Sequence, residues 1–166
     1  CHSVLNVIKG FSPEKYEIHL IGITKEGHWI YVPEAAAIED GSWYDGRKTA
    51  IISPDAVNSG IYLCDDEGHY ERRKIDVIFP VLHGKFGEDG TIQGVFEMSG
   101  IPYVGCGVLS SSVSMDKIST KIFVEKLGIR QAKFVADIAP DLSELDHTVA
   151  EAEEKLGYPV FVKPSN

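Results

Sequence analysis

Alternating apolar and polar positions predict several short strands in the first half of the chain. Tyr16–Thr24 alternates and then becomes continuously apolar, and a glycine-containing turn separates it from a second candidate strand at His28–Val32. A further short strand is predicted near Thr49–Ser53. Ile61–Cys64 and Tyr70–Arg73 flank four residues rich in Asp and Gly, and this pattern predicts a hairpin.

Other segments of the chain have apolar residues at helical spacing. Ser3–Gly10 and Thr91–Ser99 are each predicted to form a helix, with a glycine as the stop signal. A third helix has an apolar stripe from Met115 to Leu127, and we expect the serines of Ser110–Ser112 to cap it. A fourth helix is predicted from about Ser143 to Leu156, with its apolar stripe buried and its glutamates in solvent.

The strongest strand candidate is Ile75–Leu82, a nearly unbroken apolar run. Such a run is typical of a strand covered on both faces, as in a parallel sheet. With the following loop, the helix and a short strand at Ile101–Val104, it forms a β-loop-α-β unit, for which a right-handed crossover is expected. Ala132–Ala136 and Val160–Lys163 are predicted as later strands. The sequence thus predicts an α/β fold, with a parallel-sheet domain over residues 1–114 and the start of a second domain over residues 115–166.

Composition narrows the classes of function. The hydrophobic fraction of 43% and the charged fraction of 25% are those of an ordinary globular protein. A net charge of −9 argues against a nucleic-acid-binding surface, and no apolar stretch approaches the ~20 residues that cross a bilayer. Cys1, Cys64 and Cys106 are dispersed without a CxxC pair, so we expect reduced thiols, no metal site and a cytoplasmic protein.

The loop HGKFGEDG, residues 83–90, is the most informative segment. It follows the predicted buried strand and precedes a helix, where open α/β sheets place ligands. Its glycines permit close backbone approach, and the N–H groups of the next helix could donate hydrogen bonds to an anion. His83 would lie at the strand end. The alternative is an ordinary tight turn with a hydrogen-bonded His83 and with Glu88 and Asp89 in solvent, and spacing alone does not separate the two.

Two lysines are candidates for binding a phosphate. Lys117 lies in the first turns of a predicted helix. Lys163 ends the last predicted strand, where the aliphatic part of its side chain would be buried and its ammonium group would need an anion as partner. Each lysine alone is explained as well by a side chain that reaches solvent or pairs with a glutamate. The residues by themselves therefore indicate an α/β domain with an anion-binding loop.

Several motifs occur together in one order: HGKFGEDGTIQG, then IPYVG, then SSSVSMDK, then VFVKP. In that order and spacing they resemble the D-alanine–D-alanine ligase family, which includes the D-alanine–D-lactate and D-alanine–D-serine ligases of vancomycin resistance. The resemblance implies a preATP-grasp α/β domain followed by the beginning of an ATP-grasp central domain. It also implies an ATP-dependent enzyme of peptidoglycan precursor synthesis.

The resemblance suggests binding roles for particular residues. His83 matches the position that contacts the first D-alanine, and Glu88 matches a supporting position near the substrate. Lys117 and Lys163 match lysines that bind ATP phosphates. The nucleotide site is expected to be lined in addition by Phe161 and Val162.

The family's reaction converts a D-alanine carboxylate into an acyl phosphate, which the second substrate then attacks. The family uses ATP and Mg²⁺ and is typically homodimeric. Its catalytic glutamate, catalytic serine, metal-binding carboxylates and arginine match no residue here, so the resemblance assigns no catalytic or metal-binding residue and this chain alone is expected to be inactive. Two alternatives stay open: another ATP-grasp carboxylate–amine ligase, and a non-catalytic ligand-binding α/β domain.

Overall fold

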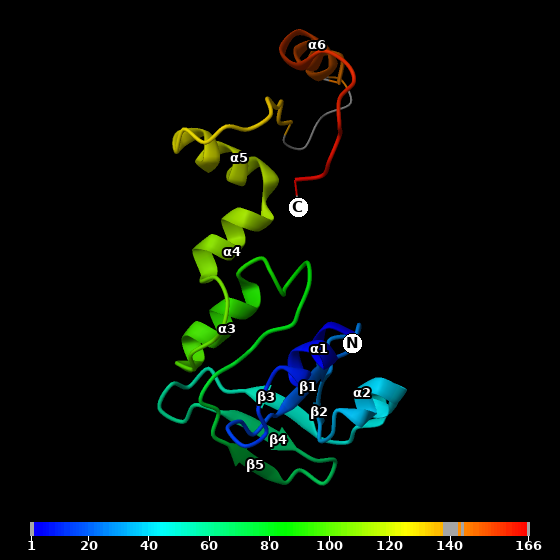
Figure 1. Cartoon of the computed structure of the whole chain (residues 1–166), viewed down its shortest axis with the longest axis vertical. Helices are drawn as coiled ribbons and strands as arrows, with labels where there is room; N and C mark the ends of the chain where they lie inside the picture. The colour runs from blue at the N-terminus through cyan, green and yellow to red at the C-terminus, as the bar shows by residue number, and fades with distance from the viewer. Residues whose placement is uncertain (1, 138–142, 144, 166) are drawn as a thin grey trace. The chain divides into compact units, whose positions relative to one another are not determined.

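The computed structural model describes residues 2–137, 143 and 145–165, and Figure 1 shows the course of the chain. The chain divides into two compact units, Cys1–Val108 and Leu109–Asn166. The first unit is built on a sheet with three helices and a 3₁₀ turn, and the second is helical.

The sheet of the first unit has five antiparallel strands, and their order in space follows their order in the sequence. Short turns explain the pairing of the first two and of the last two strands, because a turn of a few residues can join only antiparallel neighbours. Leu20 pairs with Val32 across the first turn, and Ile61 pairs with Arg73 across the last hairpin. All five strands lie within or close to segments predicted from the sequence. They are β1 (Leu20–Ile23), β2 (Trp29–Val32), β3 (Thr49–Ile52), β4 (Ile61–Cys64) and β5 (Tyr70–Arg73).

The α/β class is confirmed, but the expected parallel strand at Ile75–Leu82 is wrong. This segment makes a single parallel bridge, between Ile78 and Tyr103. The Ile78 N–H donates to Pro102 O at 2.8 Å, and the Val104 N–H donates to Ile78 O at 2.9 Å. The prolines at positions 80 and 102 have no N–H and cannot extend the ladder. The predicted strand at Ile101–Val104 is reduced to the same bridge.

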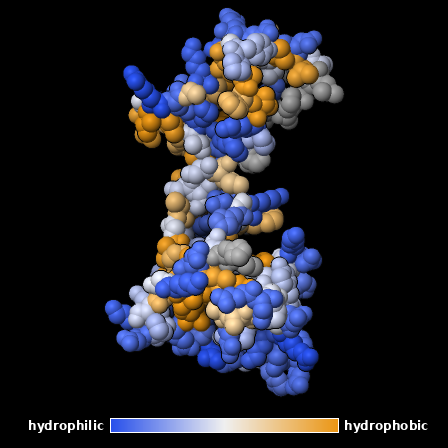
Figure 2. Space-filling view, turned by 45° about the vertical axis from the view of Figure 1, so that its right-hand side comes forward, coloured by the Kyte–Doolittle hydropathy of each residue, from blue (hydrophilic) through white to orange (hydrophobic). Residues whose placement is uncertain are grey.

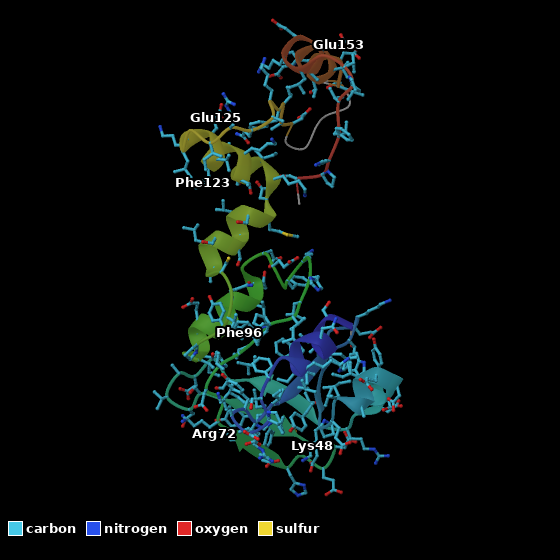
Figure 3. All side chains as sticks on the ribbon, viewed as in Figure 1. Lys48, Arg72, Phe96, Phe123, Glu125 and Glu153 are labelled. Atoms are coloured by element: carbon cyan, nitrogen blue, oxygen red, sulfur yellow. The ribbon has the colours of Figure 1, made fainter. Side chains whose placement is uncertain are left out.

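The core of the first unit lies between the sheet and α3 (Thr91–Ser99). Burial alternates along β3 and β4, as expected for strands with one covered face. Ile92 and Phe96 of α3 pack against that face, and Figure 3 labels Phe96. Burial of each large apolar side chain contributes about 1.5–3 kcal/mol. The sheet contributes Ala50, Ile52, Ile61 and Leu63 to this core.

Three short elements complete the first unit. The helix α1 (His2–Lys9) forms where the sequence predicts it, and the Gly10 N–H closes its end by donating to Val7 O at 2.9 Å. The helix α2 (Ala36–Asp40) and the 3₁₀ turn η1 (Ser42–Asp45) were not predicted. They bring Trp43 into a buried position.

The second unit contains α5 (Lys117–Lys126) and α6 (Leu145–Leu156), and α4 (Val108–Met115) leads into it. The predicted serine cap is wrong, because Ser110–Ser112 lies inside α4. Asp116 caps α5 instead: its backbone is extended, and its side chain accepts from the N–H of Ser119.

Two strands and one buried face predicted for the second unit do not form. Ala132–Ala136 and Val160–Lys163 are not strands, because a strand requires a neighbouring strand for its N–H and C=O groups and none of the described strands pairs with either segment. The stripe predicted to be buried on α6 is exposed at Leu145 (47%) and Val149 (43%) and half-buried at Ala152 and Leu156. Figure 2 shows hydrophobic residues at the surface of both units. None of the described helices is long and apolar enough to cross a membrane.

Candidate functional site

The loop of residues 83–90 is a tightly wound turn. Gly84, Phe86 and Gly90 have positive φ angles of 73°, 68° and 94°. Phe86 is the unusual member, because a residue with a Cβ rarely adopts this conformation. Gly87 lies so close to the preceding chain that an added Cβ would be 2.6 Å from Leu82 Cβ. The glycines in this motif therefore satisfy steric requirements of the loop itself.

Both carboxylates of the loop bind its own backbone. Glu88 accepts a hydrogen bond from the Gly84 N–H at 2.5 Å, and its own N–H donates to Gly84 O at 2.9 Å. Asp89 accepts from the N–H groups of Phe86 at 2.8 Å and Thr91 at 3.0 Å. The bond from Phe86, followed by those from Thr91, lowers the pKa of Asp89 below its ordinary value of 3.8. The two carboxylates therefore stabilise the turn.

The helix that follows the loop does not offer its first N–H groups to a ligand. Thr91 N–H is used by Asp89, and Ile92 N–H donates to Phe86 O at 3.1 Å. The expectation that these groups bind an anion is wrong for both positions, because the loop folds back over the start of α3. Gln93 adds to this closure, since its side-chain N–H donates to Gly87 O at 2.9 Å.

His83 is exposed at the beginning of this loop. The neighbouring Lys85 places its ammonium 5.1 Å from the centre of the Phe86 ring. That contact is a weak cation–π interaction at an exposed site. The substrate-binding roles of His83 and Glu88 stay predictions, and the structure adds that Glu88 is held by the loop backbone.

In the second unit, Lys117 lies against the end of the described chain. Its backbone N–H donates to Ser165 O at 2.9 Å, and its ammonium donates to the same oxygen at 3.1 Å. Lys163 lies two residues before Ser165 and is exposed. Among the described residues, neither lysine forms an ion pair with a glutamate, the alternative that the sequence left open. The structure therefore links the Lys117 helix to the Lys163 segment.

The two apolar residues predicted to line the nucleotide site are almost fully exposed. Phe161 is 94% and Val162 is 92% accessible. Adjacent exposed apolar side chains next to a lysine are suited to contact a base or sugar while the ammonium contacts phosphate. Their binding roles, like those of the lysines, stay predictions.

A cavity of about 320 Å³ lies beside the sheet of the first unit. Its walls are apolar and come from β1, β2, α3 and the segment 75–82, with His19 as the single titratable residue. Such a lining does not suit a zwitterionic amino acid, whose two charges need polar partners. Elsewhere in the described part of the chain, no group of three or more His, Cys, Asp or Glu residues is placed to hold a metal ion.

Sequence reasoning missed Asp116 and Ser165. Asp116 stands just before the apolar stripe of α5, which is a typical position for a helix cap, and this signal was available. The contact of Asp116 with Ser165, 49 positions later, had no local signal.

The first unit matches one protein family over nearly its whole length. The family described as "D-ala D-ala ligase N-terminus" matches residues 1–106. This chain belongs to the D-alanine–D-alanine ligase family. The match includes the 83–90 loop, so the resemblance based on that motif is confirmed.

Curated relatives in this ligase family extend the likeness over the whole chain. The D-alanine–D-alanine ligase of Acetivibrio thermocellus is 42% identical over 178 residues, which cover 99% of this chain and 47% of the relative. The vancomycin B-type resistance protein VanB of Enterococcus faecalis is 41% identical, over 98% of this chain and 44% of its own length. The chain therefore spans about half the length of the curated relatives that it matches.

Solved structures of ligases agree with this assignment. The VanG D-Ala:D-Ser ligase from Enterococcus faecalis matches with a TM-score of 0.82 and 35% identity, over 98% of this chain and 46% of that chain. The D-alanine–D-alanine ligase from Coxiella burnetii matches with a TM-score of 0.71 and 27% identity, over 92% of this chain and 44% of that chain. The predicted fold family, the N-terminal part of an ATP-grasp ligase, is confirmed.

Proposed function

We propose that the protein containing this chain is an ATP-dependent ligase that joins D-alanine to a second D-alanine, to D-lactate or to D-serine. The product would be used in peptidoglycan precursor synthesis in the cytoplasm. The family match over residues 1–106 carries this proposal. The relatives named as D-alanine–D-alanine ligases and VanB support it, and the VanG structure supports D-serine as one possible second substrate.

The first domain, proposed to extend to residue 114, would bind the first D-alanine. His83, exposed at the start of the loop, would donate a hydrogen bond to the substrate. Glu88 would act indirectly, because its carboxylate is already engaged with the Gly84 N–H. A rigid loop of this kind lowers the entropy lost when the substrate is oriented.

The second domain, proposed to begin at residue 115, would bind ATP. Lys117 and Lys163 would contact the phosphates, while Phe161 and Val162 would contact the rest of the nucleotide. Bound ATP supplies the phosphoryl group that activates the D-alanine carboxylate, and the lysines neutralise charge that develops on the phosphate oxygens. The residues fit such a ligand because two cationic groups and two exposed apolar side chains lie on joined segments. Mg²⁺ is expected in the reaction, with ligands from outside this chain, and the protein is proposed to be a homodimer.

Phosphate release by the full-length protein tests this proposal. The protein would be mixed with ATP, Mg²⁺ and D-alanine, with D-lactate or D-serine added in parallel reactions. Release that depends on D-alanine is the expected result, and the additive that most increases dipeptide or depsipeptide formation identifies the second substrate. A folded protein that binds ATP but releases no phosphate with any of the three substrates would overturn the proposal.

A further inference from the structure

The carboxylate of Asp116 joins two segments that are far apart in the sequence. One oxygen, Oδ1, accepts a hydrogen bond from the Ser119 N–H at 2.6 Å and caps α5. The other oxygen, Oδ2, accepts a hydrogen bond from the Ser165 hydroxyl. A helix cap needs only the first of these bonds. The second bond therefore has a different consequence, which is to hold the chain near residue 165 against the start of α5.

Ser165 is held by its backbone as well as by its hydroxyl. Its Oγ also accepts from the Ile118 N–H at 3.4 Å. Its carbonyl oxygen accepts from both the N–H and the ammonium of Lys117, at 2.9 and 3.1 Å. Four hydrogen bonds thus connect Ser165 with Asp116 and the first turn of α5. Only Pro164 separates Ser165 from Lys163, so the connection limits where Lys163 can lie relative to Lys117.

The charge of Asp116 suits this role. The hydrogen bond from Ser165, with further contributions from Ser119 and Lys117, lowers the pKa of Asp116 to about 2. The carboxylate is therefore ionised at neutral pH and acts only as an acceptor, so both donors keep their bonds. Hydrogen bonds to an ionised acceptor are shorter and stronger than neutral ones.

We infer that Asp116 is a positioning residue, which fastens Ser165 to the first turn of α5 so that Lys117 and Lys163 face the same polyphosphate. This inference rests on the proposed ATP-binding role of the two lysines. Asp116 would not touch the nucleotide, because its negatively charged carboxylate would repel the phosphate groups. It would act through the geometry of the two cationic groups, and Ser165 would be its partner.

The test compares variants of the full-length protein by steady-state kinetics and by calorimetric titration with ATP. Ser165→Ala removes the hydroxyl bonds to Asp116 and from Ile118, and it leaves the cap and the two bonds from Lys117 to the Ser165 carbonyl. Asp116→Ala removes both the cap and the bond to the Ser165 hydroxyl. We expect each to raise the KM and Kd for ATP about tenfold, as for loss of a charge-assisted hydrogen bond. The KM for D-alanine should stay unchanged, whereas a merely structural defect would alter the use of both substrates. Ser165→Thr keeps the hydroxyl and should restore ATP affinity.

A matched control removes a carboxylate elsewhere on the same helix. Glu125 is exposed near the end of α5, and Figure 3 labels it. Glu125→Ala should leave the KM and Kd for ATP at wild-type values. An active wild-type protein whose Ser165→Ala and Asp116→Ala variants keep normal ATP affinity would overturn this inference alone. A wild-type protein that binds ATP without D-alanine-dependent phosphate release would overturn the proposed reaction, and one that binds no ATP would overturn both.

Discussion

The indole ring of Trp43 lies directly against the backbone of Gly22. A Cβ built on Gly22 would be 2.3 Å from Cζ3 and 2.4 Å from Cε3 of the ring. Trp43 is buried, so it cannot swing into solvent without losing its packing. We predict that Gly22→Ala lowers the free energy of unfolding by about 1–3 kcal/mol, the usual cost of overpacking. Urea denaturation followed by tryptophan fluorescence measures this change.

Gly94 provides the control for that substitution. It lies within α3, has no positive φ, and an added Cβ would meet nothing within 4 Å. Because alanine favours a helix over glycine, Gly94→Ala should leave the unfolding free energy unchanged or raise it by up to about 1 kcal/mol. Equal unfolding midpoints for the two variants would contradict the close packing of Trp43 on Gly22.

The low pKa of Asp116 predicts an acid-sensitive contact in the second unit. Its folded-state pKa, about 2, lies below the ordinary value of 3.8. The stabilisation is therefore complete above about pH 4 and is lost as the pH falls through the folded-state pKa of about 2. An NMR titration of the side-chain carboxyl carbon should show a midpoint near 2. A midpoint near 3.8 would mean that the bond from Ser165 does not persist in solution.

Lys163→Ala tests the proposed phosphate contact in the full-length protein. Loss of the ammonium should lower kcat roughly a hundredfold, since a positioned charge on a transferring phosphoryl group contributes at that scale. Phosphate release under saturating substrates measures the effect. Lys126→Ala removes the same charge from an exposed position at the end of α5 and should leave kcat unchanged. Similar kinetics in both variants would remove Lys163 from the site.

His83→Ala tests the proposed contact with the first D-alanine. Loss of one hydrogen bond to a charged substrate should raise the KM for D-alanine by about tenfold or more. The KM for ATP should change little. His69→Ala, at an exposed histidine in the turn between β4 and β5, serves as the control. An unaltered KM for D-alanine in the His83 variant would exclude the assigned role.

Local sequence patterns were sufficient to predict the hairpin and the helix that follows the 83–90 loop. The hairpin of Ile61–Cys64 and Tyr70–Arg73 forms with the predicted bounds, and so does the helix Thr91–Ser99. In each case, alternation or helical spacing combines with a nearby turn or glycine, and the hydrogen bonds involved close within a few residues. The same local chemistry explains why the motif of residues 83–90 was informative, because Glu88 and Asp89 bind backbone groups inside the motif.

The amino-acid sequence alone thus determined the α/β class, most helices and hairpins, the ligase family and the candidate residues His83, Lys117 and Lys163. Only the tertiary structure decided that the main sheet is antiparallel and that the apolar run Ile75–Leu82 makes a single bridge. It alone also joined Asp116 to Ser165. The physical reason is the same in each case: the residue types of a segment determine which kinds of group it can pair with. Which distant backbone or hydroxyl group reaches it depends on how the whole chain packs.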